Sequence, residues 1–424
     1  MTLLLIGAFC LFFLLGWPVV LAILLPAIVY ILANDLPLQL VGQRMTYALD
    51  SFPLVAVPIF ILVGNIMNQA GITERIFRFA DTLVGRVPGG LGQVNIFSSL
   101  IFSGMSGAAL ADVGGLGRIE VKAMTRRGFT PQFAGALTCA SAVVGPIFPP
   151  SIPLIIYGSV TSVSIVQLLL AGIIPAILCV LLLMGTVAVM SYWRDFPRSE
   201  RWARPREIWR DLKPALPALL TPVLLVLGML LGYFTPTEAA AVTVVYVLFI
   251  SLFVYRSLTW AHLRYAAYET LKSTSAILII VSAAAIFGWI MAIEQVPQAF
   301  AQQLLSLSSD PIILLLIVNV ILLLTGMILD STTATLLVIP IIAGPLHMAG
   351  VDPVHLGIVA IFNLMIGLLT PPMGLALFLI TDIAKVPMRS ILKELLPLYI
   401  PLFGTLMIIT FFPELSLWLP KLIR

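Results

Sequence analysis

The feature that most constrains this chain is a series of glycines and prolines that occurs twice within strongly apolar sequence. Eight positions recur 222 residues later, namely Gly104, Met105, Gly128, Pro131, Gly135, Gly145, Pro149 and Pro150 as Gly326, Met327, Gly350, Pro353, Gly357, Gly367, Pro371 and Pro372. Seven of the eight matches are Gly or Pro, residues that set backbone geometry. Chain breaks at membrane depth survive only inside protein or along a cavity. The paired breaks therefore predict the binding region of a secondary transporter.

Composition sets the class of protein to which this prediction applies. Hydrophobic residues make up 60% of the chain and charged residues only 10%, which indicates an integral membrane protein. The net charge of +4 comes from short basic clusters between apolar runs, so it indicates membrane orientation and argues against nucleic acid as a partner. The cysteines Cys10, Cys139 and Cys179 lie in apolar segments without metal-ligand spacing, which argues against a zinc site or a disulfide framework.

Apolar runs of about 20 residues predict the membrane-spanning helices. We predict spans near residues 3–33, 53–70, 131–160, 166–192, 215–234, 237–255, 273–293, 355–382 and 395–412. Two further stretches, 90–117 and 311–339, carry small and polar residues at their centres and are predicted to be re-entrant hairpins. Segments 36–51, 74–87 and 256–272 mix charged and apolar residues at helical spacing, which predicts helices in the membrane interface.

The distribution of basic residues predicts that the two repeats are inverted. The connector after the first hairpin carries Arg118, Lys122, Arg126 and Arg127, and its counterpart carries Pro340, Gly344, Met348 and Ala349. By the positive-inside rule, the first connector is cytoplasmic and the second lies outside. The segment 193–214, which includes Arg201, is also basic and belongs in the cytoplasm. This topology places the N-terminus inside and the C-terminus outside, although Lys421 and Arg424 argue against that second placement.

The predicted fold is an all-α polytopic membrane protein with an inverted repeat, two re-entrant hairpins and two broken helices. Its predicted parts are scaffold helices and an interfacial arm (1–88), a first transport core (89–192), a cytoplasmic linker (193–214), scaffold helices of the second repeat (215–310), a second transport core (311–412) and a C-terminal tail (413–424).

Several motifs resemble a known family. They are the GMSGAALADVGGLG hairpin, the GPIFPPSIPLIIYG break, the LDSTTATLLVIPI hairpin, the GVDPVHLGI approach and the GLLTPPMG break. Together they resemble the large membrane subunit of tripartite ATP-independent periplasmic (TRAP) transporters, over residues from about 17 to 412. The resemblance implies sodium-driven uptake of an organic acid across the bacterial inner membrane by an elevator motion. It also implies two partners, a small four-helix membrane subunit and a periplasmic substrate-binding protein. An enzyme activity and an organic cofactor are not expected.

The breaks have a chemistry of their own. Sodium needs hard oxygen ligands, and a helix broken at Gly-x-x-x-Pro-Pro frees carbonyl groups, because proline removes a donor. Gly145 to Pro150 and Gly367 to Pro372 are such breaks, and Ser103 and Thr325 place hydroxyls at equivalent positions on the hairpins. The family resemblance implies two sodium sites, one formed by Ser103, Ser106, Gly145, Phe148 and Pro150, the other by Gly326, Gly367, Thr370 and Met373.

Four polar residues are candidate substrate contacts. Ser141 and Asn363 align on otherwise apolar helices beside the breaks, where interhelical hydrogen bonding is the alternative role. Asp112 and Asp330 do not align, and a carboxylate within the membrane costs at least roughly 2.5–3.5 kcal/mol, so each predicts either support for an ion site or a helix cap. No Arg or Lys lies in the predicted core, so half-helix N-termini would have to receive the anion.

Two other readings remain open from the sequence. A solitary sodium symporter for dicarboxylates or citrate would need no binding protein. An intramembrane serine protease is suggested by the GxSG tetrapeptide Gly104-Met105-Ser106-Gly107, but the equivalent motif at Gly326 lacks a serine and no neighbouring helix carries a histidine. The identity of the organic acid, the number of sodium ions and the oligomeric state are left open.

Overall fold

The computed structural model describes residues 2–198 and 202–422, so the predicted contributions of Arg201 and Arg424 to orientation lie outside the described residues. Within this part the chain forms helices and no strand. Seven of the described helices are long and apolar enough to cross a membrane. The all-α, multi-pass class predicted from composition is confirmed.

The described helices fall into two halves of the chain. The first half contains α1 (Thr2–Leu14), α2 (Val19–Ala33), α3 (Gln39–Leu49), η1 (Phe52–Val55), α4 (Ala56–Gln69), α5 (Ile72–Val84), α6 (Leu91–Ser106), α7 (Ala109–Gly114), α8 (Leu116–Arg126), α9 (Pro131–Ala142), α10 (Ile152–Thr161), α11 (Ile165–Ala171) and α12 (Ile173–Arg194). The second half contains α13 (Pro205–Leu230), α14 (Pro236–Phe249), a π-helical turn η2 (Ile250–Val254), α15 (Trp260–Ile293), α16 (Val296–Leu307), α17 (Pro311–Gly326), α18 (Ser331–Met348), α19 (Pro353–Gly367), α20 (Leu375–Ala384), α21 (Met388–Phe411) and α22 (Glu414–Lys421).

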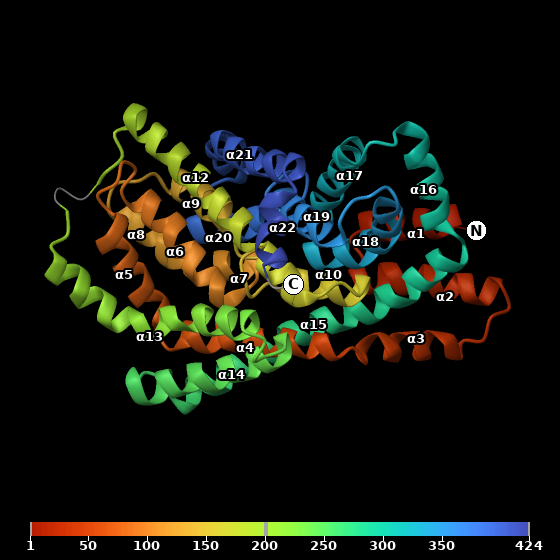
Figure 1. The fold of residues 1–424 in the computed structure, drawn as a ribbon, viewed down its shortest axis with the longest axis horizontal. Helices are drawn as coiled ribbons and strands as arrows, with labels where there is room; N and C mark the ends of the chain where they lie inside the picture. Colours follow the sequence, from red (N-terminus) through yellow and green to blue (C-terminus); the bar gives the residue numbers. More distant parts are fainter. Residues whose placement is uncertain (1, 199–201, 423–424) are drawn as a thin grey trace.

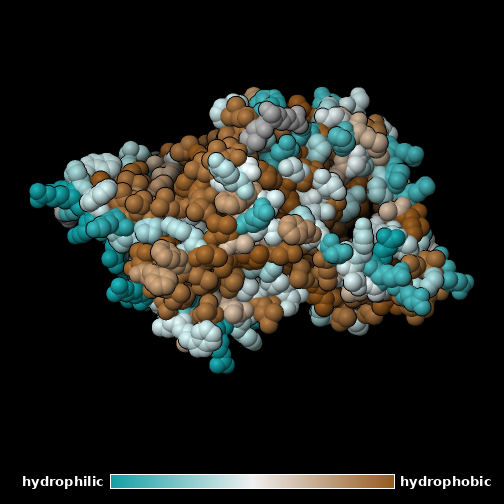
Figure 2. Space-filling model, turned by 60° about the horizontal axis from the view of Figure 1, so that its bottom comes forward, coloured by the Kyte–Doolittle hydropathy of each residue, from teal (hydrophilic) through white to brown (hydrophobic). Residues whose placement is uncertain are grey.

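One layer of long helices runs along the lower edge of Figure 1. It consists of α3, α4, α13, α14 and α15, and α15 packs against α2, α3 and α4. The hairpins and broken helices lie above it, with α6 to α9 in one group and α17 to α19 in another. Apolar side chains cover the middle of the face shown in Figure 2, and hydrophilic residues gather toward its two ends. This distribution fits a molecule whose middle faces lipid.

Several of the predicted boundaries are wrong. α13 begins at Pro205, inside the predicted linker, and not near 215, and α21 begins at Met388 and not near 395. Residues 3–33 form two helices, because Gly16 adopts a φ of +81° and Pro18 has no N–H to continue the helix. Residues 256–272 do not form a separate interfacial helix, because α15 continues without a break for 34 residues from Trp260. The Thr259 hydroxyl caps its start by accepting a bond from the His262 N–H at 3.3 Å.

The helix is interrupted at both positions that the Gly/Pro pattern predicts. The first interruption separates α9 from α10, and the second separates α19 from α20. At each interruption the chain changes partners. α9 packs on α6 and α8 of its own half and also on α21 of the other, whereas α10 packs on α18; α19 packs on α17, whereas α20 packs on α7 and α9. The segment that follows each break therefore packs against the other half of the molecule.

Candidate functional site

The tip of the first hairpin is joined to the first break by backbone contacts. α6 ends at Ser106 because Gly107 adopts the left-handed conformation, with a φ of +64°. The Gly107 carbonyl accepts a bond from the Ile152 N–H at 3.2 Å, which ties the tip to the start of α10. A methyl group added at Gly107 would lie 2.5 Å from the Pro150 carbonyl oxygen, so only glycine permits this approach.

Asp112 lies where the hairpin tip meets the break. The Ser106 hydroxyl donates to Asp112 Oδ1, whereas Oδ2 is buried and has no hydrogen-bond partner among the described residues. A methyl group added at Gly145 would lie 2.6 Å from Oδ2, so this oxygen faces the backbone of the break. Asp112 is only 2% exposed. A buried carboxylate oxygen without a partner is costly, and a nearby cation would compensate for it.

Three predicted members of the first sodium site, Ser103, Ser106 and Gly145, lie near this carboxylate, which was itself predicted as a substrate contact. Ser103 is fully buried, and its Cβ lies 3.5 Å from the position of a methyl group added at Gly145. The Ser103 hydroxyl donates to the Leu100 carbonyl at 2.7 Å, which leaves its lone pairs available. The Phe148 ring packs beside Gly104. The structure therefore brings together a carboxylate, two hydroxyls and the backbone of a broken helix, a set of hard oxygen ligands that fits sodium.

The predicted second sodium site is closed mainly by backbone. A methyl group added at Gly367 would lie 2.7 Å from the Cα of Gly326, so these two glycines allow α19 and α17 to touch. The Met373 N–H donates to the Met327 carbonyl at 3.3 Å, which joins the second break to the second hairpin. The Thr370 hydroxyl donates to the Ile366 carbonyl at 2.8 Å and keeps its lone pairs. The four predicted residues thus belong to one contact region.

Asp330 has a different environment from Asp112. It is the N-cap of α18, and its Oδ2 accepts bonds from the N–H groups of Thr332 at 2.9 Å and Thr333 at 3.1 Å. The Thr333 hydroxyl donates to Oδ1. Both carboxylate oxygens have partners within the hairpin, which is the geometry of a helix cap.

Ser141 and Asn363 both bond a broken helix to the first helix of its hairpin. The Ser141 hydroxyl donates to Asn95 Oδ1 at 2.8 Å. The Asn363 amide donates to the backbone carbonyl and to Oδ1 of Asn319, each at 2.8 Å. Both residues are fully buried, and Asn363 Oδ1 has no partner among the described residues. Their proposed contact with substrate stays a prediction.

The structure also reveals a buried carboxylate that the sequence analysis did not select. Glu120 of α8 is fully buried and accepts bonds from Asn95 at 2.8 Å, Ser98 at 2.9 Å, Thr138 at 3.3 Å and Ser99 at 3.4 Å. It ties α6, α8 and α9 together. A signal was present in the sequence, because Leu116, Glu120 and Met124 follow each other at intervals of four on the buried face of a basic helix.

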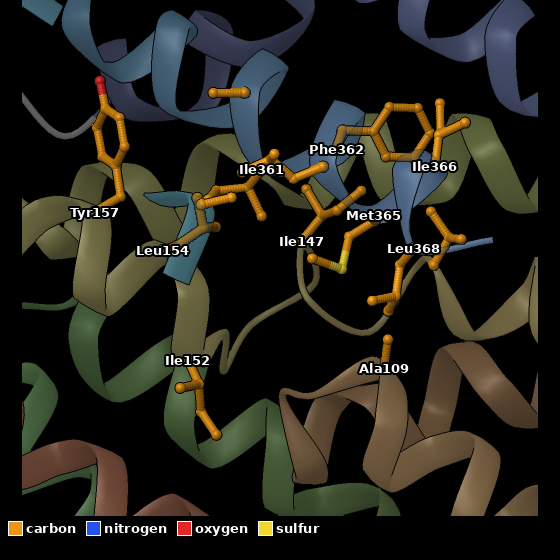
Figure 3. Close-up of a cluster of buried hydrophobic side chains, with 14 of the residues drawn as sticks. Ala109, Ile147, Ile152, Leu154, Tyr157, Ile361, Phe362, Met365, Ile366 and Leu368 are labelled. Atoms are coloured by element: carbon orange, nitrogen blue, oxygen red, sulfur yellow. The ribbon is translucent and has the colours of Figure 1, made fainter. Parts of the chain in front are cut away.

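Apolar side chains fill the space between the two breaks. In Figure 3, Ile147 of the first break lies beside Met365 of α19, with Leu368 and Ala109 below them. All four are buried. The two candidate ion sites are therefore separated by a dry contact between the halves of the molecule.

Comparisons with known proteins agree with this architecture. The family model described as "Tripartite ATP-independent periplasmic transporter, DctM component" matches residues 6–415. The sialic acid TRAP transporter large permease protein SiaM of Vibrio cholerae is 45% identical over 96% of this chain and 95% of its own length. The sialic acid TRAP transporter permease protein SiaT of Haemophilus influenzae is 40% identical over 90% of this chain, which covers 62% of that longer protein.

A solved structure shares the fold. The YdaH transporter of Alcanivorax borkumensis superimposes with a TM-score of 0.66 at 15% identity, over 90% of this chain and 87% of that one. The relatives are named as transport permeases, which is consistent with the expectation that the chain is not an enzyme. With seven candidate spans, it is a multi-pass protein of the bacterial inner membrane. The family match over nearly the whole chain, with relatives above 30% identity, shows that it belongs to the DctM component family of tripartite ATP-independent periplasmic transporters.

Proposed function

We propose that this chain carries an organic acid across the inner membrane by coupling its uptake to sodium. The observation that carries the proposal is Asp112, whose buried Oδ2 has no partner among the described residues and faces Gly145 of the first break. A negative charge in a medium of low dielectric constant needs a nearby positive charge. Sodium suits this place because the Ser106 hydroxyl and the backbone of the first break lie beside the carboxylate.

The two breaks give the coupling a physical basis. The first site would use Asp112 with the hydroxyls of Ser103 and Ser106, and the second would use freed carbonyls near Gly367 with the hydroxyl of Thr370. An anion that entered without its cations would leave net charge in the protein interior. Binding of the two kinds of ion is then mutually favourable, and each step across the membrane carries both.

The substrate is proposed to be an organic acid, and sialic acid is the first candidate because the names of both reported relatives specify it. A C4-dicarboxylate or a related sugar acid belongs to the same proposed class. Of the two half-helices that follow the breaks, α10 is capped by the Ser151 hydroxyl, whereas α20 begins at Gly374 without a side-chain cap. The N-terminus of α20 is therefore the better candidate for receiving a carboxylate.

The chain is proposed to act as one part of a tripartite system. A small membrane subunit and a periplasmic substrate-binding protein would complete it, as the description of the family as tripartite suggests. We propose that the layer of α3, α4, α13, α14 and α15 stays fixed while the hairpins and broken helices move across the membrane as an elevator. The inverted repeat predicted from the basic connectors would relate the inward-facing and outward-facing states.

Uptake by reconstituted protein tests the proposal. In proteoliposomes that contain the chain with its small subunit and binding protein, uptake of radiolabelled sialic acid should need an inward sodium gradient. Replacing sodium by choline should abolish it. A dicarboxylate set tested in parallel covers the wider substrate class. Sodium-driven uptake by the chain without a binding protein would instead support the solitary symporter.

A pair of carboxylate variants tests the role of Asp112. Asp112→Asn keeps the shape but removes the charge, so it should raise the sodium concentration for half-maximal uptake by about tenfold, which corresponds to about 1.4 kcal/mol of lost attraction. The matched control is Asp330→Asn, because asparagine is as good an N-cap as aspartate. An unchanged sodium requirement in Asp112→Asn, at equal protein levels, would remove the observation on which the proposal rests.

A further inference from the structure

A second polar region lies apart from both breaks. It is a pocket of about 400 Å³ formed where α5, α13 and the segment between η2 and α15 meet. Its lining includes Arg75 and Arg78 of α5, Asp211 of α13, and Ser257 and His262. None of these residues belongs to the proposed ion sites, so the pocket needs a separate explanation.

Arg75 is held in a fixed position. Its Nη1 donates to the carbonyls of Ala70 and Gly71, each at 3.1 Å. Its Cζ lies 4.3 Å from the centre of the Tyr255 ring, and the Tyr255 hydroxyl donates to the Pro214 carbonyl at 2.8 Å. Stacking on an aromatic ring and bonding to carbonyls fix the orientation of the guanidinium group, but no negative charge neutralises it. Its Nε and Nη2 have no partner among the described residues.

The charges in the pocket favour an anion. Arg75 and Arg78 form no ion pair within the part of the chain that the structure describes. Asp211 is already engaged, since it pairs with Arg210 at 3.2 Å and accepts a bond from the Thr82 hydroxyl at 2.6 Å. Glu74, the other acid in the lining, is exposed to solvent. Two guanidinium groups thus share the lining with two carboxylates, of which Asp211 is already paired with Arg210 and Glu74 is exposed, as Arg78 is.

The elements around the pocket carry the side chains that mark the level of lipid headgroups. Trp209 of α13 is 65% exposed, and Trp260, two residues before His262, is 79% exposed. Exposed tryptophans are enriched at the membrane interface. Phe253, in the π-helical turn just before the pocket segment, is 65% exposed and offers an apolar surface beside it. Hydrophilic residues gather at the end of the molecule where α13 begins (Figure 2).

We propose that this pocket binds the phosphate group of a membrane phospholipid, with Arg75 and Arg78 as the phosphate contacts. Arginine suits this task because its planar fork matches phosphate oxygens. Basic pockets between membrane helices on the cytoplasmic side are suited to lipid headgroups. The assignment of the lipid to the cytoplasmic leaflet depends on the proposed orientation of the chain. The binding of the lipid depends neither on that orientation nor on sodium coupling.

Native mass spectrometry of the full chain in detergent tests the proposal. The probes are dioctanoyl phosphatidylglycerol, dioctanoylglycerol without the phosphate, and soluble glycerol phosphate. The first should bind at least tenfold more tightly than either of the others, because only it offers both the phosphate and the acyl chains. Arg75→Gln with Arg78→Gln should weaken its tightest binding about tenfold or more, since two charge-assisted contacts are lost.

A second double variant controls for charge. Arg118→Gln with Lys122→Gln removes two exposed basic side chains of α8, which do not line the pocket, and should bind the lipid as the parent does. If loss of the Arg75 bonds prevents folding, Arg78→Gln alone carries the test with an expected loss of about threefold or more. The proposal would be overturned if the pocket variant and the parent bound the lipid equally. It would also be overturned if dioctanoylglycerol or glycerol phosphate bound the parent as tightly as dioctanoyl phosphatidylglycerol does. Equal binding of glycerol phosphate would indicate a site for soluble phosphate.

Discussion

In the first half of the molecule a carboxylate stands between the hairpin tip and the helix break, and in the second half backbone fills the equivalent contact. Asp112 meets Gly145 through an unpartnered oxygen, whereas Gly367 meets Gly326 directly. The acid of the second hairpin, Asp330, is turned back to cap its own helix. The two halves share the spacing of the glycines and prolines at which the helix is interrupted, but they differ in the chemical groups at each interruption.

The residues that recur in both halves set where the helix is interrupted. The residues that do not recur set whether a charged group lies at the interruption. Glycine and proline recur at both breaks and interrupt the helix in both. The buried carboxylates Asp112 and Glu120 of the first half have no acidic counterpart 222 residues on, where Ala334 and Ile342 stand. Under the proposed function, the first site holds its cation by charge and the second by carbonyl and hydroxyl dipoles alone.

The largest expected effect concerns the orientation of the two halves in the membrane, because an introduced cysteine is labelled from one face and not from the other. Ala203→Cys and Ala349→Cys, made in a background without Cys10, Cys139 and Cys179, should react with a membrane-impermeant thiol reagent from opposite faces of the membrane. The basic linker places the first inside, and the neutral connector places the second outside. Labelling of both from one face would mean that the halves are not inverted.

The next effect compares the two breaks by adding one methyl group to each. In Gly367→Ala the methyl group would meet the backbone of Gly326 at 2.5 to 2.7 Å, which cannot yield easily, so unfolding should become easier by about 1–3 kcal/mol. In Gly145→Ala it would meet the side chain of Asp112, which can rotate, so the fold should survive while uptake falls. Thermal unfolding in detergent and uptake at matched protein levels measure the two effects. If Gly145→Ala lowered the stability more than Gly367→Ala, the contact between Gly367 and Gly326 would be the more adaptable of the two.

A smaller effect is expected from the hydroxyls. Ser103→Ala and Thr370→Ala each remove one hard oxygen from a different proposed site, so each should raise the sodium concentration for half-maximal uptake several-fold, while the backbone ligands remain. Thr370→Ala should have the larger effect, because its site has no carboxylate. The folded yield should barely change, since each hydroxyl donates its hydrogen bond to a carbonyl of its own segment. If both variants keep the parent sodium dependence, the hydroxyls are structural.

The smallest effect concerns the buried bonds behind the breaks. Ser141→Ala in the first half and Thr410→Val in the second each remove one hydroxyl that bonds between helices, so each should lower the free energy of unfolding by about 0.6 kcal/mol. Thr410 accepts a bond from the Asn319 amide at 3.0 Å. Thr410→Val should leave the substrate concentration for half-maximal uptake unchanged. A raised substrate concentration in Ser141→Ala would support the predicted substrate contact, and an unchanged one would show that this hydroxyl only bonds between helices.

The positions of the breaks could be predicted from sequence because they depend on local chemistry. A single proline does not set a break, because Pro26, Pro217 and Pro340 lie inside continuous helices. The interruptions after α9 and α19 instead coincide with the paired prolines that follow Gly145 and Gly367. A proline rule applied to residues 3–33 would have placed breaks at both Pro18 and Pro26, and only the first, which follows Gly16 with its φ of +81°, is a break. The continuity of α15 was missed because Arg264, Glu269 and Lys272 suggest an interfacial helix, yet no proline separates them from the apolar turns that follow.

The environment of the site could not be predicted in the same way, because it depends on contacts between distant residues. Asp112 and Asp330 are both acids near a hairpin tip, and only the structure shows that one lacks a partner while the other caps a helix. Glu120 was hidden among basic residues of an amphipathic helix, and its four hydrogen-bond donors come from two other helices.

The exchange of partners at the two breaks has a consequence for how the molecule is built. Because α10 is covered by α18 and α20 by α7 and α9, neither half encloses its own interior. A polypeptide ending in the segment between α12 and α13 would leave the face of α10 that α18 covers without its partner. The two halves interlock, so displacing one half would disturb the packing of the other. The two halves therefore form one structural unit and not two modules joined by a linker.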